Sequence, residues 1–97
     1  MIRAYLLEKT AQAVIDLLRS DDLVGRQSIT VRNSELFSLP PETVTLVIEG
    51  SDEAVRKAEE IGKGVLKALD KGTSDKILLK LKEEEDKADQ GLGFIFE

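Results

Sequence analysis

Apolar and polar side chains alternate along two internal stretches of the chain, and this period of two predicts β-strands. In residues 26–33, Ile29 and Val31 alternate with polar neighbours, which is typical of a strand with one buried and one solvent-exposed face. Residues 43–49 are richer in β-branched side chains and predict a second strand. A loop must separate the two, because the pair of prolines between them cannot occupy a central strand.

The same alternation recurs at both ends of the chain. Residues 1–7 predict a first strand, and one continuous helix from residue 1 is the alternative. In residues 91–97, Phe94 and Phe96 share one face, which predicts a closing strand held by its aromatic side chains. A terminal strand needs such packing, because a chain end without contacts frays.

Other stretches have the period of an amphipathic helix. Apolar residues at i, i+3, i+4 and i+7 predict a helix in residues 10–20, with Thr10 as its N-cap. Residues 51–72 predict the strongest helix, with Ser51 as its N-cap. Residues 76–82 could form a strand, but the high helix propensity of residues 74–88 favours a helix, with Ile77, Leu78 and Leu81 as its apolar stripe.

The predicted order is strand, helix, strand, strand, helix, additional helix and strand. This order resembles the split βαβ, or ferredoxin-like, arrangement: βαββα plus an extra helix, then a C-terminal β-strand. The resemblance implies a single α+β domain over residues 1–97, a two-layer sandwich in which two helices cover one face of an antiparallel four-stranded sheet. Because many functions share this fold, the resemblance implies no particular activity.

The composition narrows the chemistry that the chain can perform. Its 97 residues are 41% hydrophobic and 34% charged, which is ordinary for a globular domain. The chain has no cysteine and no histidine, which excludes disulfides, thiolate catalysis, histidine bases and the usual zinc ligands. We therefore expect no cofactor and no metal site, and whether the protein is an enzyme stays open.

Charge and hydropathy predict where the protein works and what it binds. The net charge is −5 and no basic block is present, which opposes nucleic-acid binding. No apolar run has the length of a membrane span, and residues 1–9 do not read as a signal peptide, so we expect a cytoplasmic protein with no membrane partner. Abundant Lys and Glu with few Asn and Gln are compatible with a thermophilic source.

The sheet face away from the two helices is the first candidate site. It is predicted to be mixed, with apolar contributions from Leu7, Val47 and Ile95. The resemblance to ferredoxin-like domains implies that such a face can support self-association or bind a ligand, here a small anionic one. Its predicted polar residues are Arg3, Tyr5, Ser28, Thr30, Arg32, Thr43 and Thr45, and we take Arg3, Tyr5, Arg32 and Thr45 as candidate ligand-binding residues.

Gly50 and Ser51 form a second candidate, because they precede a predicted helix whose first N–H groups could bind an anion. The simpler interpretation is a turn at Gly50 and a helix cap at Ser51. Gly62 and Gly64 fall inside that predicted helix, and close packing explains such glycines better than chemistry does.

The acidic run in residues 83–89 is a third candidate, this time for a divalent cation. Hard cations need several carboxylates that converge, whereas consecutive side chains fan out around a helix. A solvated helix face is therefore the preferred interpretation. The run contains Glu83, Glu84, Glu85, Asp86 and Asp89.

We expect a small non-enzymatic binding or regulatory module that works as a homo-oligomer. The size of the chain, the missing histidine and cysteine, and the mixed sheet face favour this function. One alternative is a small enzyme with a site between subunits that uses Lys, carboxylate or Arg chemistry. The other alternative is a divalent-cation-binding acidic protein.

Overall fold

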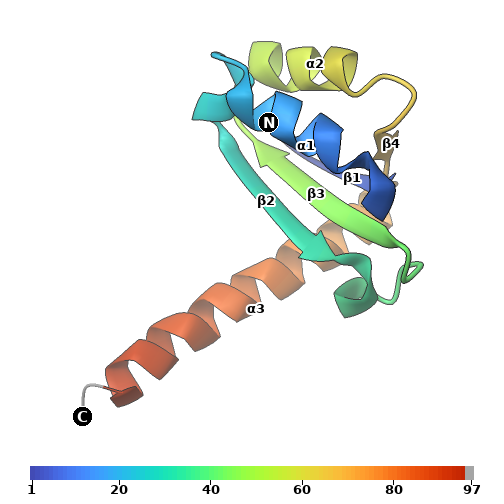
Figure 1. Ribbon diagram of the computed structural model, residues 1–97. Coiled ribbons are helices and arrows are strands. Elements are labelled where there is room, and N and C mark those ends of the chain that lie inside the picture. Colours follow the sequence, from blue (N-terminus) through green and yellow to red (C-terminus); the bar gives the residue numbers. More distant parts are fainter. Residues whose placement is uncertain (96–97) are drawn as a thin grey trace.

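The computed structural model describes residues 1–95, with side chains described for residues 1–84. In this part of the chain an antiparallel four-stranded sheet combines with three α-helices (Figure 1). The strands are β1 (Ile2–Glu8), β2 (Ser28–Asn33), β3 (Thr43–Glu49) and β4 (Lys67–Ala68). The α-helices are α1 (Gln12–Ser20), α2 (Asp52–Ile61) and α3 (Lys71–Ile95). Short 3₁₀ turns are η1 (Lys9–Ala11), η2 (Val24–Arg26) and η3 (Ser34–Phe37).

The strands lie side by side in the order β2-β3-β1-β4, and each neighbouring pair is antiparallel. The central strands β1 and β3 pair along their whole length, from Ile2 opposite Glu49 to Glu8 opposite Thr43. In the next pair along the sheet, Ser28 of β2 lies opposite Glu49. Strand β2 therefore forms one edge, and the two-residue β4 forms the other.

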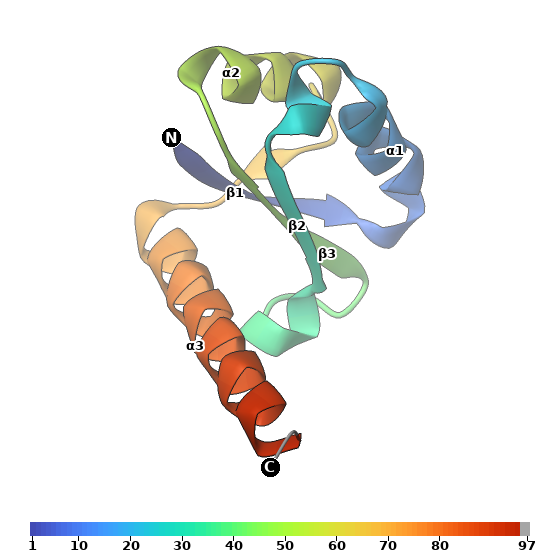
Figure 2. The same cartoon turned by 90° about the vertical axis from the view of Figure 1, so that its left-hand side faces the viewer.

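Helices α1 and α2 cover one face of the sheet (Figures 1 and 2). Their apolar stripes pack on the strand residues that point to that side, and the resulting core is closed to solvent. The buried members of this first cluster are Tyr5, Leu7, Ile15, Leu18, Val24, Leu46, Ile48, Val55 and Ala58.

Helix α3 lies on the opposite face and runs outward past the sheet (Figure 1). Its fully buried Ile77 packs with Ala4 of β1 and Val47 of β3, and these three residues form a second, smaller cluster. Central strands therefore bury side chains on both faces, while β2 keeps alternating polar positions. No described helix combines the length and the apolar character that a bilayer crossing requires.

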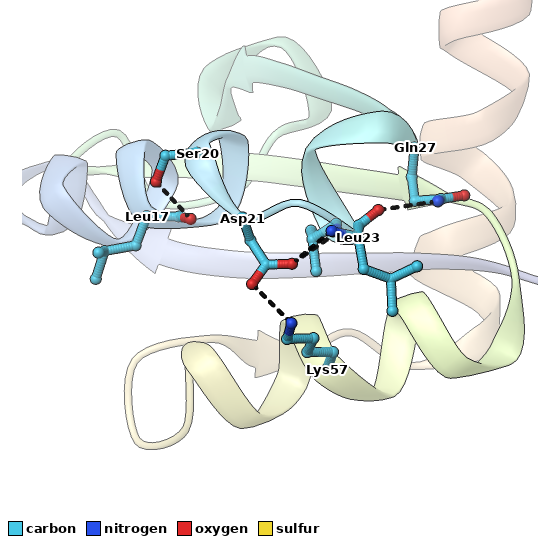
Figure 3. A network of polar contacts seen from close by, with 7 residues as sticks. Leu17, Ser20, Asp21, Leu23, Gln27 and Lys57 are labelled. Atoms are coloured by element: carbon cyan, nitrogen blue, oxygen red, sulfur yellow. Dashed lines mark hydrogen bonds and ion pairs between the residues drawn. The ribbon is translucent and has the colours of Figure 1, made fainter.

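A polar network fixes the end of α1 against α2 (Figure 3). Asp21 Oδ1 accepts hydrogen bonds of 2.9 Å from the backbone N–H groups of Leu23 and Val24, while its Oδ2 lies 3.0 Å from Lys57 Nζ on α2. The bonds from Val24 and Lys57, in that order, lower the pKa of the Asp21 carboxyl group. The charged carboxylate thus ties the two helices together.

The predicted C-terminal strand is wrong. Residues 91–95 continue α3, and the fourth strand is β4, far earlier in the chain. Phe96 lies outside the described residues. The alternation around Phe94 favoured a strand, but the preceding helix extends through it despite Gly91 and Gly93.

The second predicted helix is confirmed at its start and wrong at its end. Ser51 caps α2, since its hydroxyl accepts a 3.2 Å hydrogen bond from the Ala54 N–H. The helix stops at Ile61, and Gly62 forms its C-cap. Gly64 has a left-handed backbone with φ of 84°, so the two glycines end the helix and turn the chain into β4.

The third predicted helix is confirmed, and it begins earlier than expected. Asp70 precedes α3, and its side chain accepts a 2.7 Å hydrogen bond from the Thr73 N–H. In contrast, the predicted N-cap role of Thr10 is wrong, because Thr10 lies inside η1 and its hydroxyl meets Glu8 at 3.4 Å. Helix α1 begins without a side-chain cap.

Candidate ligand-binding groove

A groove of about 510 Å³ lies between α3 and the sheet face formed by β2 and β3. Its volume falls within the range of about 300–1,000 Å³ that small-molecule sites occupy. The apolar lining residues come from β1, β3 and α3: Ile2, Val47, Leu78 and Leu81. The polar and charged lining residues are Ser28, Thr30, Arg32, Glu49, Lys82 and Glu84.

Arg32 and Glu84 connect the rim of this groove. Arg32 Nη2 lies 3.0 Å from Glu84 Oε1, and Arg32 Nε donates to the same oxygen at 3.1 Å. Both side chains are well exposed, at 39% and 51%, so the pair contributes only about 0–1 kcal/mol to stability. The arginine holds a carboxylate through two nitrogens at a place that solvent reaches.

Only part of the predicted sheet-face site comes together here. Ser28, Thr30 and Arg32 line the groove together, as strand alternation predicted. The face itself is not open, however, because α3 packs across Val47, which is only 6% exposed. The prediction that this face is open is therefore wrong, while self-association of the chain stays a prediction.

Tyr5 lies on the other side of the sheet from the position that was predicted for it. It is 1% exposed within the first cluster, and its hydroxyl donates a 2.9 Å hydrogen bond to Glu59 Oε2 on α2. Burial and, secondly, the Glu59 carboxylate raise the pKa of Tyr5 well above its usual value. A buried phenol with a satisfied hydroxyl is a structural group and not a ligand contact.

Arg3 and Thr45 are not groove residues either. Arg3 is exposed and shares the β1 side of Tyr5 by strand alternation, so it was predicted on the wrong face. Thr45 does lie on the α3 side, but it is 1% exposed and its hydroxyl meets the Ser34 hydroxyl at 2.9 Å. This buried pair anchors η3 to β3.

Gly50 and Ser51 lie at the end of β3 and the start of α2. Gly50 exchanges backbone hydrogen bonds of 2.9 and 2.8 Å with Met1. Ser51 serves as the cap, and the first turn of α2 carries Asp52 and Glu53. These carboxylates already complement the helix dipole and repel an incoming anion, so the anion site predicted here has no support in the geometry.

The acidic run divides between described and undescribed side chains. Glu83 is exposed, and Glu84 pairs with Arg32. Within the described side chains, no three acidic groups converge to hold a metal ion. Glu85, Asp86 and Asp89 lie beyond the described side chains, and the predicted solvated face stays a prediction for them.

Sequence reasoning missed the contribution of α3 to the groove. The apolar residues Ile77, Leu78 and Leu81 were recognised as a helical stripe, but no sheet face was assigned to receive it. The signal that could have found it lies in β1, where Ala4 and Leu6 as well as Tyr5 and Leu7 are apolar. A strand that is apolar on both faces needs a covering layer on both faces.

Comparison with known proteins adds no relative to this picture. The chain matches no protein-family model, no curated protein and no solved structure.

Proposed function

We propose that the protein is a small non-enzymatic binding module that works as a homo-oligomer and binds a small organic anion with an apolar body in the groove. One observation carries the proposal. Arg32, at the rim of a groove with an apolar floor, already holds a carboxylate through two nitrogens. Because a guanidinium group takes carboxylate and phosphate groups in the same forked geometry, a ligand anion can replace Glu84 there.

The floor of the groove sets the rest of the ligand. Leu78 and Leu81 are half-buried, pack against the cluster that contains Val47 and line the groove, so they offer apolar surface to a hydrocarbon or an aromatic ring. The hydroxyl groups of Ser28 and Thr30 offer additional hydrogen bonds along β2. An apolar pocket with a few placed polar groups is the usual form of a small-molecule site.

We also infer that the fold is a variant of the ferredoxin-like arrangement. The strand order β2-β3-β1-β4 and the two helices on one face support this inference. The variant has a very short fourth strand and a third helix on the opposite face. That third helix forms one wall of the groove.

A thermal-shift screen with aliphatic and aromatic monocarboxylates tests the binding function, with the matching amides as uncharged controls. We expect a carboxylate, and not its amide, to raise the melting temperature, because a ligand of the native state stabilises it. Arg32→Gln should weaken binding roughly tenfold or more, as the loss of a charged hydrogen-bond donor does. Arg3→Gln is the matched control, since Arg3 is exposed and outside the groove. Equal effects of the two substitutions, or no carboxylate that binds, would refute the proposal.

A further inference from the structure

Strand β2 forms an edge of the sheet that has little protection. It has six residues, pairs with β3 in an unbroken register, and contains neither proline nor lysine. The opposite edge is protected because its strand is short: β4 has two residues. Proteins normally shorten, charge or cover a strand edge because its free backbone groups pair with other strands. A long regular edge with one charged residue, Arg32, is suited to pairing.

The backbone hydrogen bonds between the ends of β1 and β3 show which groups of β2 point outward. Met1 and Gly50 exchange hydrogen bonds, and the Lys9 N–H donates to the Glu42 carbonyl, so the even-numbered residues of β3 bond to β1. The odd-numbered residues of β3 therefore bond to β2, where their partners are Ser28, Thr30 and Arg32. The backbone groups of the residues between them point away from the sheet: Ile29, Val31 and Asn33.

We propose that two copies of the chain pair through β2, antiparallel, with the two-fold axis at Thr30, and so form one continuous eight-stranded sheet. This proposal rests on the self-association proposed above and adds the surface and the register. A two-fold interface uses the same patch on both copies, which an antiparallel pair of identical strands satisfies. Ile29 of each copy then exchanges backbone hydrogen bonds with Val31 of the other.

Side-chain chemistry selects this register over its neighbours. Facing residues must point to the same side of the sheet, so the residue on the two-fold axis must face its own copy. Neighbouring registers therefore differ by moving the axis one residue along β2. With Thr30 opposite Thr30, the apolar Ile29 meets the apolar Val31. With Val31 opposite Val31, Ile29 would meet Asn33. With Ile29 opposite Ile29, Arg26 would meet Arg32, and facing like charges are unfavourable.

The chosen register also pairs opposite charges. Arg32 of the second copy lies opposite Ser28, and Ser28 lies opposite Glu49 on β3. Strands are roughly 4.8 Å apart, so the backbones of Glu49 and of that arginine are about 10 Å apart. Both side chains point to the α3 face, and the short Ser28 between them leaves them room to meet. The second copy thereby contributes a cation to the groove, which Glu49 and Ser28 line.

One existing contact must change on pairing. Arg32 Nη1 donates a 2.9 Å hydrogen bond to the Val31 carbonyl, one of the outward groups. The N–H of Ile29 from the second copy replaces this donor. Nη1 of Arg32 is then available to Glu49 of the second copy, while Nε and Nη2 keep their contacts to Glu84.

Helix α3 leaves room for the second copy. Its Glu84 meets Arg32 of β2, which lies two residues, or about 7 Å along the strand, from the proposed axis. With the crossing at this contact, the two copies of α3 pass the axis about 14 Å apart on the same side of the sheet. Packed helices lie about 8–10 Å apart, so the helices lie beside each other without overlap.

Cysteine crosslinking in the full chain tests the register directly, because the chain has no cysteine of its own. Facing residues that do not exchange hydrogen bonds have Cα atoms about 4.5 Å apart, which a disulfide can span. Thr30→Cys should form a disulfide dimer on mild oxidation. Ser28→Cys and Arg32→Cys should each stay uncrosslinked alone and crosslink when mixed. Ser20→Cys, exposed on α1, is the control that should not crosslink.

Two further measurements separate the interface from self-association itself. Light scattering after size exclusion should show a dimer. A monomer at all concentrations would overturn both the proposed self-association and the proposed β2 interface. A dimer in which Thr30→Cys does not crosslink would overturn the interface alone. Glu49→Arg and Arg32→Glu should each raise the dimer dissociation constant roughly fivefold, and the double substitution should restore it. If the doubly substituted protein dimerises as weakly as the single variants do, this register is also refuted.

Discussion

The hydroxyl group of Tyr5 donates a 2.9 Å hydrogen bond to Glu59 Oε2 and so joins the central strand β1 to α2. Burial first, and then the neighbouring carboxylate, raise the pKa of this tyrosine above its usual value of 10.0. The unfolded chain therefore loses the tyrosine proton at a lower pH than the folded protein does. Stability from this group is fully present below pH 10 and falls as the pH rises further.

Tyr5 is the one tyrosine of the chain, so tyrosinate absorbance reports on it alone. We expect the folded protein to titrate well above pH 10 and the urea-unfolded chain to titrate near pH 10. Tyr5→Phe should cost roughly 0.5–1.5 kcal/mol at neutral pH, because it removes the hydrogen bond. The variant should also lose less stability than the parent in alkali. A folded-state titration near pH 10 would show that the hydroxyl is not buried.

Asp21 should make the stability of the fold depend on pH in the acid range. Its pKa is lowered in the folded state, so its contribution is present above the usual value of 3.8 and is lost as the pH falls through the lowered value. Asp21→Asn keeps an acceptor for the backbone but removes the charge that faces Lys57. We expect a lower melting temperature at neutral pH and a difference from the parent that shrinks in acid. Asp22→Asn, at an exposed neighbour, is the control, and an equal loss there would contradict this role.

Ile77 should anchor α3 to the sheet. Ile77→Ala removes a fully buried side chain and should cost about 2–5 kcal/mol in urea unfolding. Leu79→Ala is the matched control on the same helix, since Leu79 is 60% exposed, and it should change stability by about 0.5 kcal/mol or less. Equal effects at the two positions would mean that α3 does not dock on the sheet as described.

Two glycines should respond to alanine with opposite signs. Gly64 has φ of 84° and open space around it, so Gly64→Ala meets no clash but strains the backbone by about 1–2 kcal/mol. Gly72 lies in the first turn of α3, and a Cβ there makes only an ordinary contact, 3.6 Å from Asp70 Oδ1. Gly72→Ala should therefore stabilise by up to about 1 kcal/mol. Calorimetry of both variants checks the pair, and a stabilising Gly64→Ala would contradict the left-handed turn.

Strands β2 and β3 and the start of α2 could be predicted from the sequence because their signals are local. The alternation of Ile29 and Val31 with polar neighbours fixes which side faces the core, and Ser51 provides its own cap. Both signals depend on residues only a few positions apart. Arg32 was therefore predicted correctly on the sheet face away from α1 and α2.

The errors arise where a decision depends on distant partners. Both faces of β1 are apolar, so alternation could not decide that Tyr5 points to α2, and its partner Glu59 is far along the chain. The two-residue β4 has no periodicity of its own and follows a helix-like stretch. The groove forms only because α3 docks across β1 and β3. An apolar stripe on a helix does not by itself specify which surface it packs against.

Ala4 and Tyr5 are adjacent in sequence but belong to clusters of unequal size on opposite faces of the sheet. Among the side chains that the structure describes, nine buried residues hold α1 and α2, whereas three hold α3. Detachment of α3 exposes only the smaller cluster and leaves the sheet backed by the other two helices. Hydrogen exchange should therefore divide the chain into two cooperative units, with the amides of α3 opening at a lower free energy than those of β1 and β3.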